Sequence, residues 1–213
     1  MTEHQASERE KIELYLEHYD AINDIRETFD DQWEAFAEEW PDRLEASLER
    51  DGIDTADWTF LSMGRDWGSI FHRGWWRRTD DLAIISDRDR PDVRVSFIHR
   101  LEGNRRTALG DRTLFFYFRN AGSNDQSFIE TFNSNFASGA EEIEDLLPAA
   151  AERTENRRNL TEAAYDIRVD DHDDFFDAYI SALQRAFTEH AVENEGFVDI
   201  IDRIYEESIE SEY

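Results

Sequence analysis

Cysteine is absent from this 213-residue sequence, and lysine is almost absent, since Lys11 is the single lysine. The lack of cysteine excludes a disulfide framework, a thiol nucleophile and a cysteine-ligated zinc ion. No apolar run approaches the roughly 18 residues that a membrane span needs, and acids stand where a signal peptide requires positive charge. We therefore expect a soluble, cytoplasmic protein with no membrane partner and no cofactor.

Positive charge is scarce as well. The 51 Asp and Glu residues outnumber the 23 Lys and Arg residues, and the net charge is −28. This excess excludes a generic basic nucleic-acid or membrane binder. Arginine as almost the whole basic complement of an acidic chain resembles the composition of halophilic proteins, which work in molar salt. The Debye length there is about 3 Å, so self-repulsion is screened, and we expect both fold and function to depend on salt.

Motifs of common enzyme classes are lacking too. The sequence contains no glycine-rich phosphate loop, no GxGxxG or GxSxG motif and no histidine pair at zinc-ligand spacing. One acidic turn carries Asp87, Asp89 and Asp92, which are suitable oxygen ligands for a hard cation, but a solvated turn explains them better. We therefore expect no metal site, and we favour a protein without enzymatic activity.

The apolar spacing predicts an α+β fold. Apolar residues recur every three or four positions from Ile12 to Trp40, which predicts a long amphipathic helix that Pro41 interrupts, with a short second helix before Gly52. Helical spacing returns beyond Gly122 and forms the C-terminal helices, apart from a short strand at 165–169. Between them, residues 58–120 predict a central, mainly antiparallel sheet of about five strands, at Trp58–Met63, Trp67–Phe71, Leu82–Ser86, Val93–Leu101 and Thr113–Arg119.

This pattern predicts two regions. Residues 1–52 form a helical arm packed on or beside an α+β core of residues 53–213, which ends in an acidic tail from about residue 206. The apolar seam over residues 12–40 offers an alternative, because a seam of this length could pair two copies in a homodimer. Packing onto the chain's own core is the favoured interpretation.

The strand from Val93 to Leu101 has two different faces. The period of two separates one set, Val93, Val95, Phe97, His99 and Leu101, from a second set, Arg94, Ser96, Ile98, Arg100 and Glu102. We expect the first face to meet the core, with His99 as a buried core histidine, and the second face to meet water or a partner.

Positive charge is concentrated in the middle of the chain. Residues 58–120 hold 12 basic and 8 acidic residues, a net of +4, whereas residues 1–57 carry −14 and residues 121–213 carry −18. The densest stretch, residues 65–78, reads RDWGSIFHRGWWRR. Arginine and aromatic side chains together can clamp phosphates and stack bases. The candidate ligand-binding residues are Arg65, Trp67, His72, Arg73, Trp75, Trp76, Arg77 and Arg78, together with Arg105 and Arg106 at the tip of the predicted hairpin.

The leading interpretation is a non-enzymatic binding protein of a halophilic cytoplasm, whose Arg/Trp-rich sheet surface binds nucleic acid or a protein partner. Two alternatives stay open. The arginines could pair with the surrounding acidic helices while the tryptophans fill the core. The chain could also be a hydrolase or transferase for a phosphate-bearing substrate, with His72 as acid–base and Arg73, Arg77 and Arg78 as a clamp.

Overall fold

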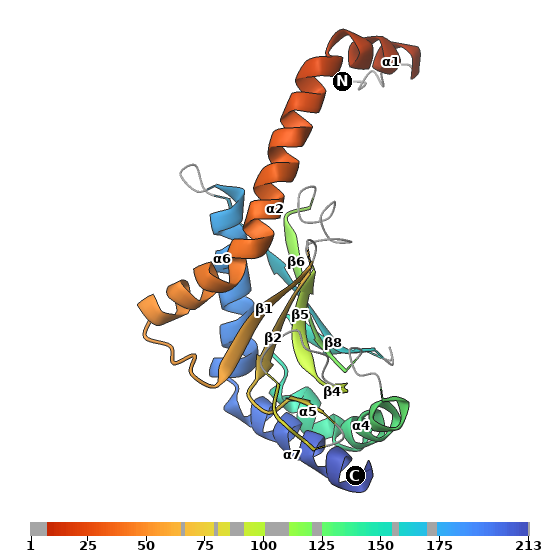
Figure 1. Ribbon diagram of the computed structural model, residues 1–213, viewed down its shortest axis with the longest axis vertical. Coiled ribbons are helices and arrows are strands. Elements are labelled where there is room, and N and C mark those ends of the chain that lie inside the picture. Colours follow the sequence, from red (N-terminus) through yellow and green to blue (C-terminus); the bar gives the residue numbers. More distant parts are fainter. Residues whose placement is uncertain are drawn as a thin grey trace. The chain divides into compact units, whose positions relative to one another are not determined.

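The computed structural model describes residues 8–64, 67–78, 81–85, 92–100, 111–120, 125–154, 158–169 and 174–212 (Figure 1). The chain divides into two compact units, residues 1–36 and residues 37–213. The predicted regions 1–52 and 53–213 stay a prediction. Among the described helices, none has the length and apolar character that a bilayer crossing demands. The α+β class and the long N-terminal helix are confirmed.

The first unit contains α1 (Glu8–Glu17) and the first part of α2 (Tyr19–Arg50). Large apolar side chains of this unit are exposed, among them Ile12, Leu16 and Ile25. The homodimer through residues 12–40 stays a prediction.

α2 runs through Pro41 without a break, so the predicted interruption is wrong. A proline inside a helix costs about 3 kcal/mol, because it removes one backbone hydrogen bond and crowds the preceding turn. Beside it, Trp40, Leu44 and Leu48 are fully buried, and each such side chain contributes about 1.5–3 kcal/mol. Burial therefore outweighs the proline. The predicted helix end is confirmed, because Gly52 has a φ of +77° and completes the C-cap.

Six strands of the described chain form one antiparallel sheet, in the order β1-β2-β5-β6-β8-β7. The strands are β1 (Trp58–Gly64), β2 (Trp67–His72), β5 (Ser96–Arg100), β6 (Thr113–Arg119), β7 (Ala151–Arg153) and β8 (Asn159–Asp166). Only four of them come from the predicted region 58–120. β8 ends at Asp166, so the strand predicted at 165–169 lies mostly outside it.

A second, two-stranded sheet pairs β3 (Trp76–Arg77) with β4 (Val93–Arg94). The predicted strand from Val93 to Leu101 is thus divided between two sheets at Val95, whose carbonyl accepts a hydrogen bond from the Trp76 indole at 3.2 Å. In the described part of the segment predicted as a strand at 82–86, Ile84 makes only an isolated bridge to Arg77.

Helices cover one face of the main sheet. They are α4 (Gln126–Ser138), α5 (Ala140–Leu146), α6 (Phe175–Phe187), the π-helix η1 (Thr188–Val192) and α7 (Glu195–Glu212). The ring of Phe97 in β5 lies 5.2 Å from that of Phe116 in β6 and 6.0 Å from that of Phe197 in α7. α6 runs alongside the sheet (Figure 1). Residues 206–212, expected as an acidic tail, continue α7 as helix, and Ile209 is buried.

His99 lies in this core, as predicted. Its side chain is fully buried, and burial lowers its pKa to about 3. The imidazole packs against the Trp40 ring at 4.3 Å, and its Nδ1 lies 3.3 Å from the Tyr179 hydroxyl. Gly68 of β2 is paired with His99, and a Cβ there would overlap both His99 and Trp40. The glycine is therefore required by the close approach of the two rings.

Candidate functional site

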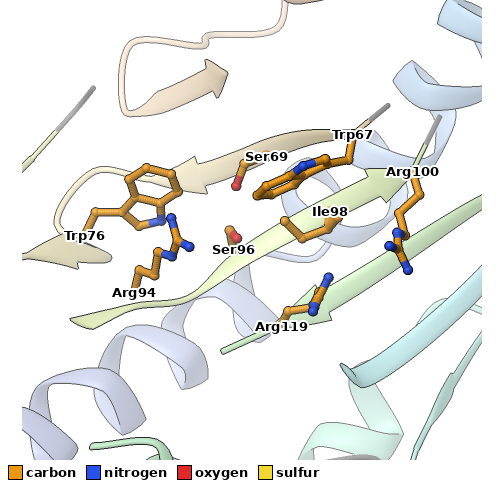
Figure 2. Close-up of a pocket in the computed structure, with 8 residues that line it drawn as sticks. All are labelled: Trp67, Ser69, Trp76, Arg94, Ser96, Ile98, Arg100 and Arg119. Carbon is orange, nitrogen blue, oxygen red and sulfur yellow. The ribbon is translucent and has the colours of Figure 1, made fainter. Parts of the chain in front are cut away.

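A pocket of about 250 Å³ opens on the sheet face opposite the helices (Figure 2). We call it the arginine pocket. Its lining residues are Trp67 and Ser69 from β2, Trp76 from β3, Arg94 from β4, Ser96, Ile98 and Arg100 from β5, and Arg119 from β6.

Strand alternation and register bring these side chains together. Antiparallel pairing sets Ser69 opposite Ile98, Trp67 opposite Arg100 and Ser96 opposite Arg119, and paired residues share one face of a sheet. Ile70, which follows Ser69 in β2, is paired with Phe97, and these two side chains point to the helix-covered side of the sheet. The small sheet adds Trp76 opposite Arg94 at one end of the pocket. This is the face that the sequence predicted to meet water or a partner.

Three arginines of the pocket have no carboxylate partner among the described residues. Burial lowers the pKa of Arg94, and burial together with the positive charge of Arg100 lowers the pKa of Arg119. Arginines elsewhere in the described chain do pair with acids, as Arg203 does with Glu142 at 3.1 Å. In a chain of net charge −28, the pocket is therefore a local site of positive charge that no described carboxylate pairs with.

Two buried polar atoms of the pocket also lack a hydrogen-bond partner in the described structure. They are the hydroxyl of Ser69, a fully buried residue, and Nε of Arg119. Leaving such a group unsatisfied costs about 1–3 kcal/mol, so buried polar groups are generally paired. In Figure 2 the hydroxyls of Ser69 and Ser96 lie between Trp76 and Trp67. The pocket therefore contains donors without acceptors.

The two tryptophans of the pocket differ in accessibility. Trp76 is 1% exposed, is stacked on Phe71 with ring centroids 3.9 Å apart, and carries the Arg94 guanidinium 5.3 Å from its centroid. It is a wall of the pocket rather than a free stacking surface. Trp67 is half-buried, so it is the more accessible of the two tryptophans that line the pocket.

The other candidates from residues 65–78 lie elsewhere. Trp75 is buried in the core, where its indole donates a hydrogen bond to Asp202. Arg77 forms a bidentate ion pair with Glu206 on α7, and Arg73 and Arg78 are exposed. Arg77 and Trp75 fit the alternative in which arginines pair with acidic helices and the tryptophans fill the core, whereas Arg73 and Arg78 do not.

His72 lines a different pocket, of about 360 Å³, whose acidic residues are Asp54, Asp57, Glu195, Asp199 and Asp202. The hydrogen bond to Asp202, with Nδ1 3.3 Å from Oδ1, raises the pKa of His72, and the nearby carboxylates add to this effect against the lowering by burial. Such surroundings repel an anionic substrate. The structure therefore does not assemble the predicted acid–base residue with an arginine clamp.

Several candidates fall outside the described residues, namely Arg65, Arg105, Arg106, Asp87 and Asp89. Within the described part, no group of three or more histidines and acids is placed to hold a metal ion. Asp92 is half-buried next to β4, and its backbone N–H donates to the carbonyl of Arg77 at 2.9 Å.

The sequence-based candidates contained Trp67 and Trp76 but missed the arginines and serines of the pocket. The missed signal was the strand pattern, which already placed Arg94, Ser96 and Arg100 on one face. Local density of arginine and tryptophan pointed instead to residues 65–78, whose described members lie in the core, in two pockets and at the surface.

The chain matches no protein-family model, and comparison with curated proteins and with solved structures finds no match. The function therefore has to be argued from the geometry of the site.

Proposed function

We propose that this chain is a non-enzymatic binding protein that holds single-stranded nucleic acid in the arginine pocket. The observation that supports this is that Arg94, Arg100 and Arg119 line one pocket and have no carboxylate partner among the described residues. Guanidinium groups bind phosphate through paired, charge-assisted hydrogen bonds, and they remain protonated at all physiological pH values. A phosphate in the pocket would balance the charge that the protein leaves unbalanced.

The Trp67 indole favours nucleic acid over an acidic protein face. A carboxylate of Asp or Glu satisfies a guanidinium but provides no flat ring, whereas each nucleotide carries a phosphate and an aromatic base. Base–aromatic stacking contributes about 1–3 kcal/mol per base in single-strand binding. The half-buried Trp67, paired in register with Arg100, provides both kinds of contact within one residue pair.

The proposal places this binding in molar salt. In dilute buffer, a chain of net charge −28 repels nucleic acid over long distances, and molar salt screens that repulsion. The same salt weakens exposed phosphate contacts. Contacts inside a pocket and stacking on an indole are screened less, which suits Arg119, whose side chain is partly buried.

The test is fluorescence anisotropy of short, labelled single-stranded DNA and RNA of mixed sequence in about 1 M KCl, where the Debye length is about 3 Å. We expect the wild-type protein to bind, and Arg119→Gln to bind at least about tenfold more weakly, the loss of one charge-assisted contact. Arg203→Gln is the matched control, since it removes the same charge from an exposed ion pair outside the pocket.

Three results would contradict the proposal. Wild-type protein that binds neither DNA nor RNA overturns nucleic-acid binding. Equal binding by Arg119→Gln and Arg203→Gln moves the site away from the arginine pocket. Binding of polyglutamate in preference to every oligonucleotide assigns the pocket to an acidic protein partner instead.

A further inference from the structure

The arginine pocket has few stacking surfaces for an extended strand. Proteins that hold single strands along their length present several aromatic side chains to successive bases. Here Trp75 and Trp76 are each 1% exposed, and Trp67 is the one tryptophan of the described pocket that is not fully buried. One accessible indole accommodates one base.

The size of the pocket also indicates that it binds one nucleotide and not several. Its volume of about 250 Å³ is below the roughly 300–1,000 Å³ of pockets that enclose a drug-sized ligand. The floor is formed by small or buried side chains of β2 and β5, namely Ser69, Ser96 and Ile98. The pocket therefore has room for a phosphate with its adjoining sugar or base, and not for several nucleotides.

The charge and donors of the pocket exceed what one internal phosphate can use. A phosphodiester carries one negative charge and has two free oxygens. A phosphate monoester carries about −1.5 to −2 at neutral pH and has three acceptor oxygens. The pocket offers a phosphate three guanidinium groups and the Ser69 hydroxyl. Of these donors, the Ser69 hydroxyl and Arg119 Nε have no hydrogen-bond partner in the described structure.

We infer that the arginine pocket binds a phosphate monoester attached to a single nucleotide, such as the terminal phosphate of a strand. Arg100 and Arg119 hold the phosphate oxygens, the Ser69 hydroxyl donates to one of them at the floor, and the base of the same nucleotide stacks on Trp67. This assignment rests on the proposed nucleic-acid binding and narrows it to recognition of an end. A free nucleoside monophosphate offers the same chemistry, and the experiment separates the two sources.

The experiment compares one oligonucleotide sequence with a 5′-phosphate, with a 3′-phosphate and with hydroxyl groups at both ends, in about 1 M KCl. A nucleoside 5′-monophosphate and its nucleoside are titrated separately. We expect one phosphorylated end to bind at least about tenfold more tightly than the hydroxyl form, as a charge-assisted contact predicts.

Ser69→Ala is the sharpest variant for this site. It removes a hydroxyl that has no partner in the described structure, so the empty protein should fold as well as wild type. We expect it to lose most of the preference for the phosphorylated end, whereas Arg203→Gln keeps that preference. A preference that Ser69→Ala leaves intact would overturn this role of the pocket.

The outcomes distinguish this inference from the proposed function. Equal affinity for phosphorylated and hydroxyl ends overturns end recognition and leaves nucleic-acid binding in place. Binding of the monophosphate without binding of any oligonucleotide supports the monoester site and overturns nucleic-acid binding. Binding of none of these molecules overturns both.

Discussion

Replacement of Arg119 by methionine should stabilise the empty protein and weaken ligand binding at the same time. Arg119 is partly buried in β6, and its Nε has no hydrogen-bond partner in the described structure. Burial, together with the positive charges of Arg100 and Arg158, lowers its pKa. Arg119→Met keeps a long apolar stem in the pocket and removes the guanidinium. If the guanidinium binds a ligand and does not stabilise the fold, its removal should increase the free energy of unfolding of the ligand-free protein.

The expected gain is about 1 kcal/mol in the free energy of unfolding. An unsatisfied buried donor costs about 1–3 kcal/mol, and the lower part of that range applies because Arg119 is only partly buried. In a chain of this size, about 1 kcal/mol corresponds to a rise of about 2–4 °C in Tm. A ligand at about 100 times its Kd stabilises wild type by about 2.7 kcal/mol. With saturating ligand, the wild-type protein should therefore melt at a higher temperature than Arg119→Met.

The assay is thermal unfolding in about 1 M KCl, with and without the 5′- and 3′-phosphorylated oligonucleotides. Arg203→Met is the matched control, because Arg203 is about half exposed and its pair with Glu142 contributes about 0–1 kcal/mol. We expect Arg203→Met to melt at or slightly below the wild-type temperature and to keep the full shift with ligand.

The reasoning is refuted if Arg119→Met melts below Arg203→Met in the absence of ligand. That result would show that the guanidinium of Arg119 holds the fold together. The unbalanced charge of the pocket would then no longer support a ligand site.

Three further predictions concern the fold. Because a net charge of −28 is screened only by salt, Tm should rise from dilute buffer to molar KCl, and an unchanged Tm would contradict this. Gly68→Ala should lower the free energy of unfolding, measured with denaturant, by about 3 kcal/mol, because the new Cβ overlaps two rings. In the control variant Gly139→Ala the new Cβ meets no atom closer than 3.5 Å, so this change should be nearly neutral. By NMR, the His99 imidazole should not titrate between about pH 7.5 and 5, and the free energy of unfolding should fall as acid protonates this group in the unfolded chain. A titration of His99 near pH 6.5 would contradict the burial argument. His72 has a raised pKa and acts in the opposite sense: its contribution to the stability of the folded protein is complete below pH 6.5 and is lost as pH rises through its folded pKa.

Local signals predicted much of the fold correctly. Apolar periodicity indicated helices at both ends and an antiparallel pair from β5 and β6, and Gly52 marked a helix end. Pro41 shows the limit of local signals. Its cost is set by its own chemistry, but the compensating burial of Trp40, Leu44 and Leu48 depends on elements far away in the sequence.

The sequence by itself determined the α+β class, the absence of cysteine chemistry, the acidic charge and the strand face that carries Arg94 and Arg100. Only the tertiary structure decided which of the described arginines pair with a described carboxylate and which do not. Arg77 is neutralised by Glu206, which lies 129 residues away, whereas Arg119 lies opposite Ser96 on the pocket face because of the register between β5 and β6. Ion pairing and strand register join residues distant in the chain, and no local pattern of residue types encodes such contacts.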